Sequence, residues 1–141
     1  MSFKQEDYPC LCISLRRSER IITDIYNESL KGTGLLITQF SLLVEIRKLE
    51  CPSMKQLADV VGLDRSTLAR NLSLLEATSF VRLRDGDQRN KIVELTASGR
   101  SAIERATPKW REAEAEIQRR LGSLADKIPK MHYLLEKRAD G

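Results

Sequence analysis

The chain has 141 residues, of which 41% are apolar and 31% are charged, and its formal net charge is +4. This composition is typical of one folded domain, or of one domain with an added oligomerisation element, and it excludes a disordered protein. No stretch approaches the roughly 18 apolar residues of a membrane-spanning helix and the N-terminus lacks a signal-peptide core, so we expect a cytoplasmic protein without a membrane partner.

Two helices are expected in the first third of the chain. Apolar residues recur at helical spacing from residue 10 to about residue 31, and this first helix should end in the Gly32–Gly34 region. A second helix is predicted over Gln39–Leu49 with Thr38 as its N-cap, and Pro52 lies beyond its end. The second helix is apolar on nearly all sides, which favours a buried position.

Two short helices joined by a tight turn follow. Ser53 and Gln56 have the spacing of a capping box, so a helix should start after Ser53 and end at Gly62. Asp64 is the expected N-cap of the next helix, from residue 65 to about residue 78. Its apolar stripe consists of Leu68, Leu72 and Leu75. This arrangement predicts a helix-turn-helix motif.

In the helix that follows Asp64, the face opposite the leucine stripe is short, polar and cationic. It carries, with its first turn and flanks, Arg65, Ser66, Thr67, Arg70 and Ser73. Arginine can form a forked contact with guanine in the major groove, whereas serine and threonine can reach bases or phosphates. A helix N-terminus also favours phosphate. We therefore expect this helix to enter the major groove of double-stranded DNA.

A β-hairpin with a charged tip is predicted next. Residues 81–84 and 92–95 have strand patterns, and the segment between them is rich in turn residues. The candidate DNA-contacting residues of this hairpin are Arg84, Asp87, Arg89 and Lys91. We expect Arg89 to enter a narrow minor groove, held by an ion pair to Asp87, and Lys91 to contact phosphate. Without the neighbouring helix pair, a solvated charged turn would be the preferred interpretation.

Helical periodicity returns after Thr96. The apolar seam of this long helix is typical of a helix that packs along a partner. It consists of Ile103, Ala106, Trp110, Ala113, Ile117 and Leu121. Pro108 lies inside the helix and should kink it, because proline removes one backbone hydrogen bond.

Several short motifs in this region occur in a characteristic order. They are Leu57-Ala58, Gly62, Asp64 to Thr67, Leu75-Glu76, Asp87-Gln88-Arg89 and Leu95 to Gly99. The pattern resembles the MarR family of bacterial regulators over residues 35–121. The opening from Cys10 to Arg17 and the pair Pro108 and Trp110 also resemble one subgroup of that family.

The resemblance implies a mainly α protein with a small β-hairpin wing. Residues 1–34 would form an N-terminal dimerisation helix, 35–96 a winged helix-turn-helix DNA-binding domain, and 97–141 the C-terminal dimerisation helices. The homodimer would bind a near-palindromic operator, more often as a repressor than as an activator. The family usually has glycine where this chain has Ser79, so we expect the helix end there to differ locally.

Two sensing hypotheses arise. The resemblance implies an effector pocket in which Trp110 and Tyr26, with Tyr133 as a neighbour, would bind a small phenol or aromatic acid. The alternative is that Trp110 is a core or interface residue. Cys10 and Cys12 suggest a thiol switch, but two residues apart on a helix they point about 200° from one another. Ordinary small apolar residues are the alternative, also for Cys51.

Other function classes have little support. The sequence has no phosphate-binding glycine loop, no nucleophile elbow and a single histidine, so we expect neither an enzyme nor a cofactor. His132 is distant from all three cysteines, which argues against a metal site. A winged helix that docks proteins without reading DNA is the main alternative, and salt-dependent binding to duplex DNA would distinguish the two functions.

Overall fold

The computed structural model describes residues 10–87 and 90–136. Over these ranges the chain is mainly helical with one antiparallel hairpin, as predicted. The helices are α1 (Leu11–Ser29), α2 (Ile37–Leu49), α3 (Met54–Val61), α4 (Arg65–Ala77), α5 (Ala97–Leu121) and α6 (Met131–Glu136). The strands are β1 (Val81–Asp85) and β2 (Lys91–Leu95), and short 3₁₀ turns at Gly122–Leu124 and Ile128–Lys130 connect α5 to α6.

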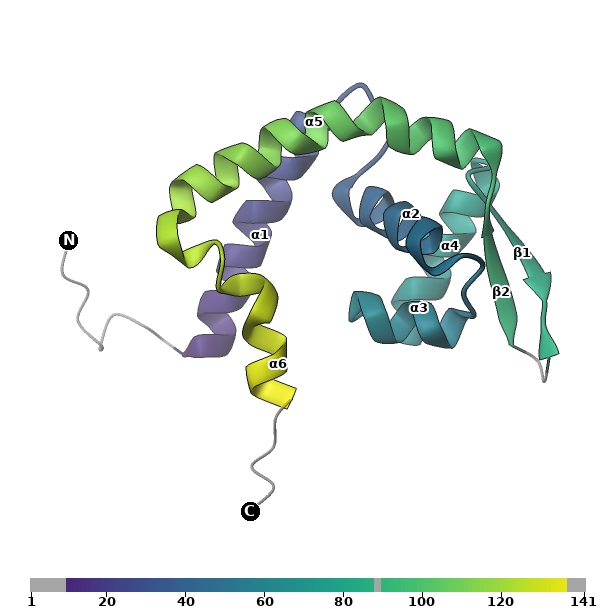
Figure 1. Ribbon diagram of the computed structural model, residues 1–141, viewed down its shortest axis with the longest axis horizontal. Coiled ribbons are helices and arrows are strands. Elements are labelled where there is room, and N and C mark those ends of the chain that lie inside the picture. The colour runs from purple at the N-terminus through teal and green to yellow at the C-terminus, as the bar shows by residue number, and fades with distance from the viewer. Residues whose placement is uncertain (1–9, 88–89, 137–141) are drawn as a thin grey trace, which may run out of the picture.

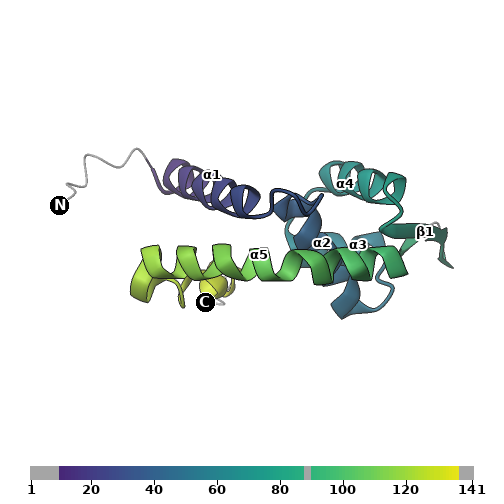
Figure 2. The same ribbon diagram turned by 90° about the horizontal axis from the view of Figure 1, so that it is seen from above.

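The long helix α5 organises the molecule. Figure 1 shows it as one arched ribbon, with α2, α3, α4 and the hairpin gathered beneath its N-terminal half and α1 beneath its C-terminal half. Seen from above, α1 and α5 run side by side (Figure 2). Helix α5 continues through Pro108 without interruption. The fold therefore has two lobes that share one helix.

The hydrophobic core lies in the lobe around α2. This helix buries Phe40, Leu42, Leu43 and Ile46, which confirms its predicted buried position. The fully buried residues packed around it from the other elements include Leu57, Leu68, Leu72, Leu75, Val93 and Ile103. The first turns of α5 join this core through Ala102 and Ala106.

The other lobe is thinly packed. Neither α1 nor α6 contains a buried residue. Large apolar side chains are exposed on both helices, with Leu11 at 83% and Leu135 at 75%. The remainder of this exposed set includes Ile13, Leu15, Ile21, Tyr133 and Leu134. An apolar surface of this kind is unusual for a free monomer.

The predicted start of α2 was wrong. Thr38 lies inside the helix, which begins at Ile37 after the extended residue Leu36. The N–H of Leu36 donates to Gln39 Oε1 at 2.9 Å, and the N–H of Ile37 donates to Asn27 Oδ1 at 2.8 Å. One cap of α2 therefore comes from α1, a contact that the local sequence of α2 does not reveal.

The end of α4 follows the left-handed geometry that glycine usually supplies. Ser79 has φ of 67°, the N–H of Phe80 donates to the carbonyl of Leu75 at 2.9 Å, and the N–H of Ser79 donates to that of Glu76 at 2.9 Å. This is a Schellman motif. The expected local departure is therefore absent: Ser79 adopts the strained conformation itself.

No helix in residues 10–87 and 90–136 combines the length and the apolar character needed to cross a membrane.

Candidate nucleic-acid interface

The helix pair α3–α4 has the predicted caps and turn. Ser53 Oγ accepts from the N–H of Gln56 at 3.1 Å, and Gln56 Oε1 accepts from the N–H of Ser53 at 2.9 Å, which closes the capping box. Helix α3 ends at Gly62, whose φ of 68° allows the tight turn into α4. Leu57 and Leu68 are fully buried in the core that α3 and α4 share with α2.

The polar face of α4 is directed to solvent. The exposed residues on it are Arg65, Ser66, Arg70 and Ser73, whereas Thr67 is half-buried. Leu74 is 54% exposed at the edge of the same face. The structure thus brings Ser66, Arg70 and Ser73 onto one exposed face of α4, with Arg65 exposed in the first turn and Thr67 half-buried at the edge.

Asp64 organises the first turn of α4. Its Oδ1 accepts from the N–H of Thr67 at 2.7 Å and from Ser66 Oγ at 2.8 Å, and its Oδ2 accepts from Thr67 Oγ1 at 3.0 Å. These hydrogen bonds, the backbone N–H of Thr67 first, lower the pKa of the Asp64 carboxyl, and the charge of Arg70 lowers it further. The carboxylate is therefore ionised at neutral pH. The sequence predicted the cap but not the two hydroxyl bonds.

The wing pairs its charges internally. In the β1–β2 register Arg84 lies opposite Ile92 and Asp85 opposite Lys91. The Arg84 guanidinium forms an ion pair with Glu94, and Lys91 Nζ lies 3.5 Å from Asp85 Oδ1. Both candidate cations are thus exposed but already have an anionic neighbour, which reduces the charge that they offer to a ligand.

At the tip of the wing, Asp87 is exposed and its carbonyl accepts from the N–H of Asn90 at 3.1 Å. Arg89 lies outside the described residues, and so does the predicted Asp87–Arg89 ion pair. The base of the wing is anchored on two sides. The N–H of Val93 donates to the carbonyl of Pro52 at 2.9 Å, and Thr96 Oγ1 donates to the carbonyl of Ser79 at 2.6 Å.

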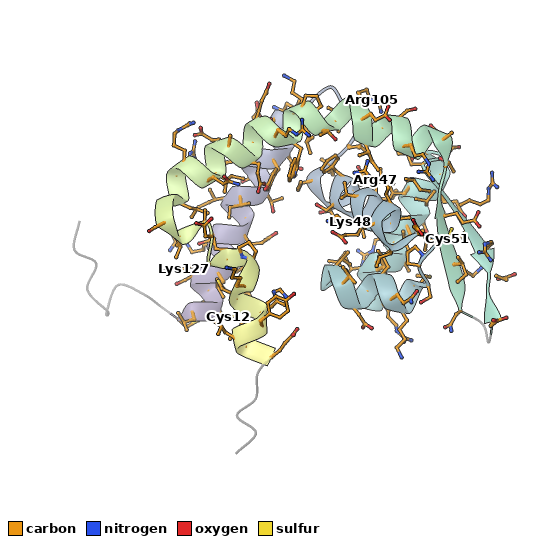
Figure 3. The ribbon with its side chains drawn as sticks, viewed as in Figure 1. Cys12, Arg47, Lys48, Cys51, Arg105 and Lys127 are labelled. Carbon is orange, nitrogen blue, oxygen red and sulfur yellow. The ribbon has the colours of Figure 1, made fainter. Side chains whose placement is uncertain are left out.

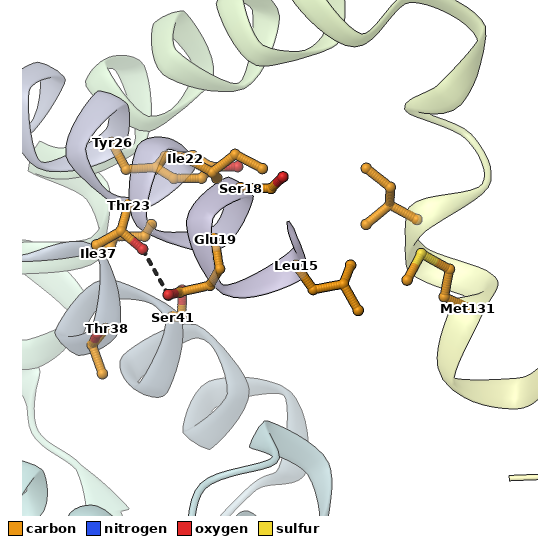
Figure 4. A pocket seen from close by; sticks show the side chains of 11 residues that line it. Leu15, Ser18, Glu19, Ile22, Thr23, Tyr26, Ile37, Thr38, Ser41 and Met131 are labelled. Atoms are coloured by element: carbon orange, nitrogen blue, oxygen red, sulfur yellow. Dashed lines mark hydrogen bonds between the residues drawn. The ribbon is translucent and has the colours of Figure 1, made fainter. Parts of the chain in front are cut away.

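The two aromatic residues of the predicted effector pocket line different grooves. Trp110 stacks on Phe40 with ring centroids 5.8 Å apart, and its groove lies between α2 and α5 beside Arg47 and Arg111. Tyr26 lines a second groove between α1, α2 and the C-terminal segment (Figure 4). Tyr133 is 61% exposed and packs against the neighbouring His132.

The Tyr26 groove holds about 360 Å³ and is mainly apolar, with Leu15, Ile22 and Met131 among its walls. The hydroxyl of Tyr26 donates to a carboxylate oxygen of Glu114 on α5. Burial raises the pKa of Tyr26, and the hydrogen bond to Glu114 adds to the effect. The phenol is therefore neutral and acts as a donor that ties α1 to α5.

The cysteines lie in two separate places. Cys10 and Cys12 are exposed at the start of α1, where Cys10 Sγ accepts from the N–H of Ile13 at 3.3 Å and Cys12 Sγ accepts from Arg16 Nη2 at 3.6 Å. Cys51 is exposed between α2 and α3, beside the wing (Figure 3). Among the residues that the structure describes, no three His, Cys, Asp or Glu side chains group as metal ligands.

Comparisons with known proteins agree with this geometry. Residues 35–91 match the model of the MarR family. An HTH-type transcriptional regulator of Bacillus cereus is 34% identical over 82 residues, which are 58% of this chain and 55% of the relative, so the chain spans about half the length of the curated relatives that it matches first. The regulator YwaE of Bacillus subtilis is 28% identical over 127 residues, which cover 89% of this chain and 73% of that protein.

Among solved structures, the transcriptional regulator MosR of M. tuberculosis in complex with DNA has a TM-score of 0.80 and 36% identity to this chain. The match covers 89% of this chain and 92% of that one, and therefore includes both lobes.

Proposed function

Because this chain belongs to the MarR family, we propose that it is a sequence-specific DNA-binding regulator of transcription that represses a promoter as a homodimer. The observation that supports this most directly is the exposed cationic face of α4, held by caps at the end of a helix-turn-helix and flanked by a charged wing. The DNA complex of MosR, which is 36% identical, supports the same function.

Each candidate residue has a proposed role. Ser66, Thr67 and Arg70 read the major groove, with Ser73 further along the same face. The phosphate contacts come from Arg65 and Lys91, and the minor-groove contact comes from Arg89, steadied by Asp87. Arg84 mainly stiffens the wing through its ion pair with Glu94.

The exposed apolar faces of α1 and α6 support homodimerisation, because burial of apolar surface is the main driving force of association. We assign residues 1–34 and 97–141 to dimerisation and residues 35–96 to DNA binding. Two α4 helices held at one spacing would meet half-sites about 34–36 Å apart. A signal that changes this spacing would release the operator.

Two kinds of signal are consistent with the structure. A small phenol or aromatic acid fits the apolar Tyr26 groove, which lies between the two lobes. The Trp110 ring, stacked on Phe40, is better explained as part of the core. An oxidant acting on the exposed Cys10 and Cys12 is the other candidate. Selection of bound fragments from random DNA, repeated with a panel of phenolic acids and with an oxidant, tests both.

The decisive experiment measures affinity for the selected duplex as salt rises. A DNA-binding protein with six to ten phosphate contacts should lose about 10³–10⁵-fold in affinity between 50 and 200 mM salt, whereas a protein-docking module should bind no DNA. Arg70→Ala should relax sequence preference, and Arg89→Ala should weaken binding to all sites more evenly. Arg119→Ala, at the far end of α5, is the control and should change neither the sequence preference nor the overall affinity for DNA.

A further inference from the structure

The first turn of α4 fixes the direction of two hydroxyl groups. A serine or threonine hydroxyl has one hydrogen to donate and two lone pairs to accept. The hydrogens of Ser66 and Thr67 both point to the Asp64 carboxylate, at 2.8 and 3.0 Å between the oxygens. The lone pairs of both hydroxyls therefore remain for a ligand. Toward DNA, this part of the helix presents acceptors.

An acceptor surface limits which DNA groups it can bind. Phosphate oxygens only accept hydrogen bonds, so hydroxyls held in this way have nothing to donate to them. In the major groove, the only base groups that donate are the amino groups of adenine and cytosine. Arg70 has the opposite character, since a guanidinium only donates and pairs with guanine acceptors.

We propose that Asp64 is a specificity-determining residue: it holds Ser66 and Thr67 as acceptors, so that they select adenine or cytosine over guanine or thymine on the DNA strand that faces them. The inference rests on the proposed function, because it requires α4 to enter the major groove. Asp64 itself does not touch DNA and acts as a positioning residue through the two hydroxyls.

The test is D64N, which preserves shape and a good N-cap. The asparagine oxygen can still accept from the N–H of Thr67, but the asparagine nitrogen donates where Asp64 accepted from Thr67 Oγ1. The Thr67 hydroxyl hydrogen is then free to point outward. D64N also removes a negative charge near the DNA, which should raise affinity for all sequences alike, so only the ratio between bases is diagnostic.

The measurement is selection from random duplexes, followed by affinities for all four base pairs at each half-site position. Wild type should prefer adenine or cytosine at the position that Thr67 faces by at least about fivefold. D64N, which releases the Thr67 hydroxyl but leaves Ser66 bonded to the amide oxygen, should reduce or reverse that ratio. Ser66→Ala and Thr67→Val, which keep the Asp64 cap of the helix, should flatten the preference at the same position. Ser101→Ala, at an exposed position of α5 outside the proposed interface, is the matched serine control and should leave that position unchanged.

The outcomes distinguish a failure of the role proposed for Asp64 from a failure of the proposed DNA-binding function. If wild type is sequence-specific but D64N leaves every base ratio unchanged, the role of Asp64 is overturned and the proposed function stands. The same conclusion follows if Thr67→Val alters a different position from D64N. If wild type shows no salt-dependent binding to any duplex, the proposed function fails and the inference fails with it.

Discussion

Replacing Ser79 by glycine should stabilise the protein, although it removes a side chain. Ser79 connects α4 to the wing with φ of 67°. In this left-handed region the Cβ of an L-residue approaches the following carbonyl oxygen. The hydrogen bonds of the Schellman motif need only the backbone, so glycine can keep them.

The expected gain is a difference between two opposing effects. The left-handed conformation costs about 1–2 kcal/mol for an L-residue. Glycine loses more backbone freedom on folding, at a cost of about 0.5–1 kcal/mol relative to alanine. The net stabilisation of Ser79→Gly should therefore be about 0.5–1 kcal/mol. For a chain of this size, that corresponds to a rise in Tm of about 1–4 °C.

The assay is thermal unfolding followed by circular dichroism, at one protein concentration because the Tm of a dimer depends on concentration. Ser101→Gly is the matched control, since Ser101 is exposed within α5. It should have the opposite sign and destabilise by roughly 0.5 kcal/mol, the difference in helix propensity. A loss of stability in Ser79→Gly similar to that of the control would refute the assignment of strain to Ser79.

Three further predictions follow from single contacts. Gly99→Ala should destabilise by about 1–3 kcal/mol in urea, because a Cβ there would lie 2.2 Å from the carbonyl oxygen of Phe80; an unchanged midpoint would contradict it. Asn27→Ala should cost about 1 kcal/mol by removing the acceptor of the Ile37 N–H, whereas Asn27→Asp keeps an acceptor and should cost less. The stability that Asp64 contributes relative to Asp64→Ala should be present at pH 7 and disappear as the pH falls through its lowered pKa, because protonation weakens its bonds; a difference that did not decrease at all on acidification would exclude this.

The candidate interface could be predicted largely from the sequence because its determinants are local. The Ser53 capping box, Gly62 and the Asp64 cap act within about four residues of the position that they control. The exposed face of α4 then follows from the helical period and the buried stripe. Ser79 shows the limit of this reasoning: the residue type indicated strain, but the backbone hydrogen bonds decided that the left-handed turn forms anyway.

The grooves could not be predicted, because they depend on how helices cross. Trp110 and Tyr26 both have the aromatic character expected of an effector pocket, but Trp110 packs toward α2 and Tyr26 toward Glu114. Periodicity assigns a residue to a face of its own helix and does not determine which other helix that face meets. The internal charge pairing of Arg84 depends in the same way on the register of the two strands.

The last turns of α1 form contacts with other helices that the sequence of α1 does not reveal. Their polar side chains look like an ordinary solvated surface in the sequence, yet Tyr26 bonds to Glu114, Asn27 caps α2, and Ser29 Oγ donates to the carbonyl of Lys109 at 2.7 Å. No side chain of α1 is fully buried, and these three bonds attach its last turns to α2 and α5. The same helix exposes apolar residues at its other end. Helix α1 is therefore fixed to α2 and α5 at its C-terminal end, while the apolar side chains of its N-terminal end are exposed.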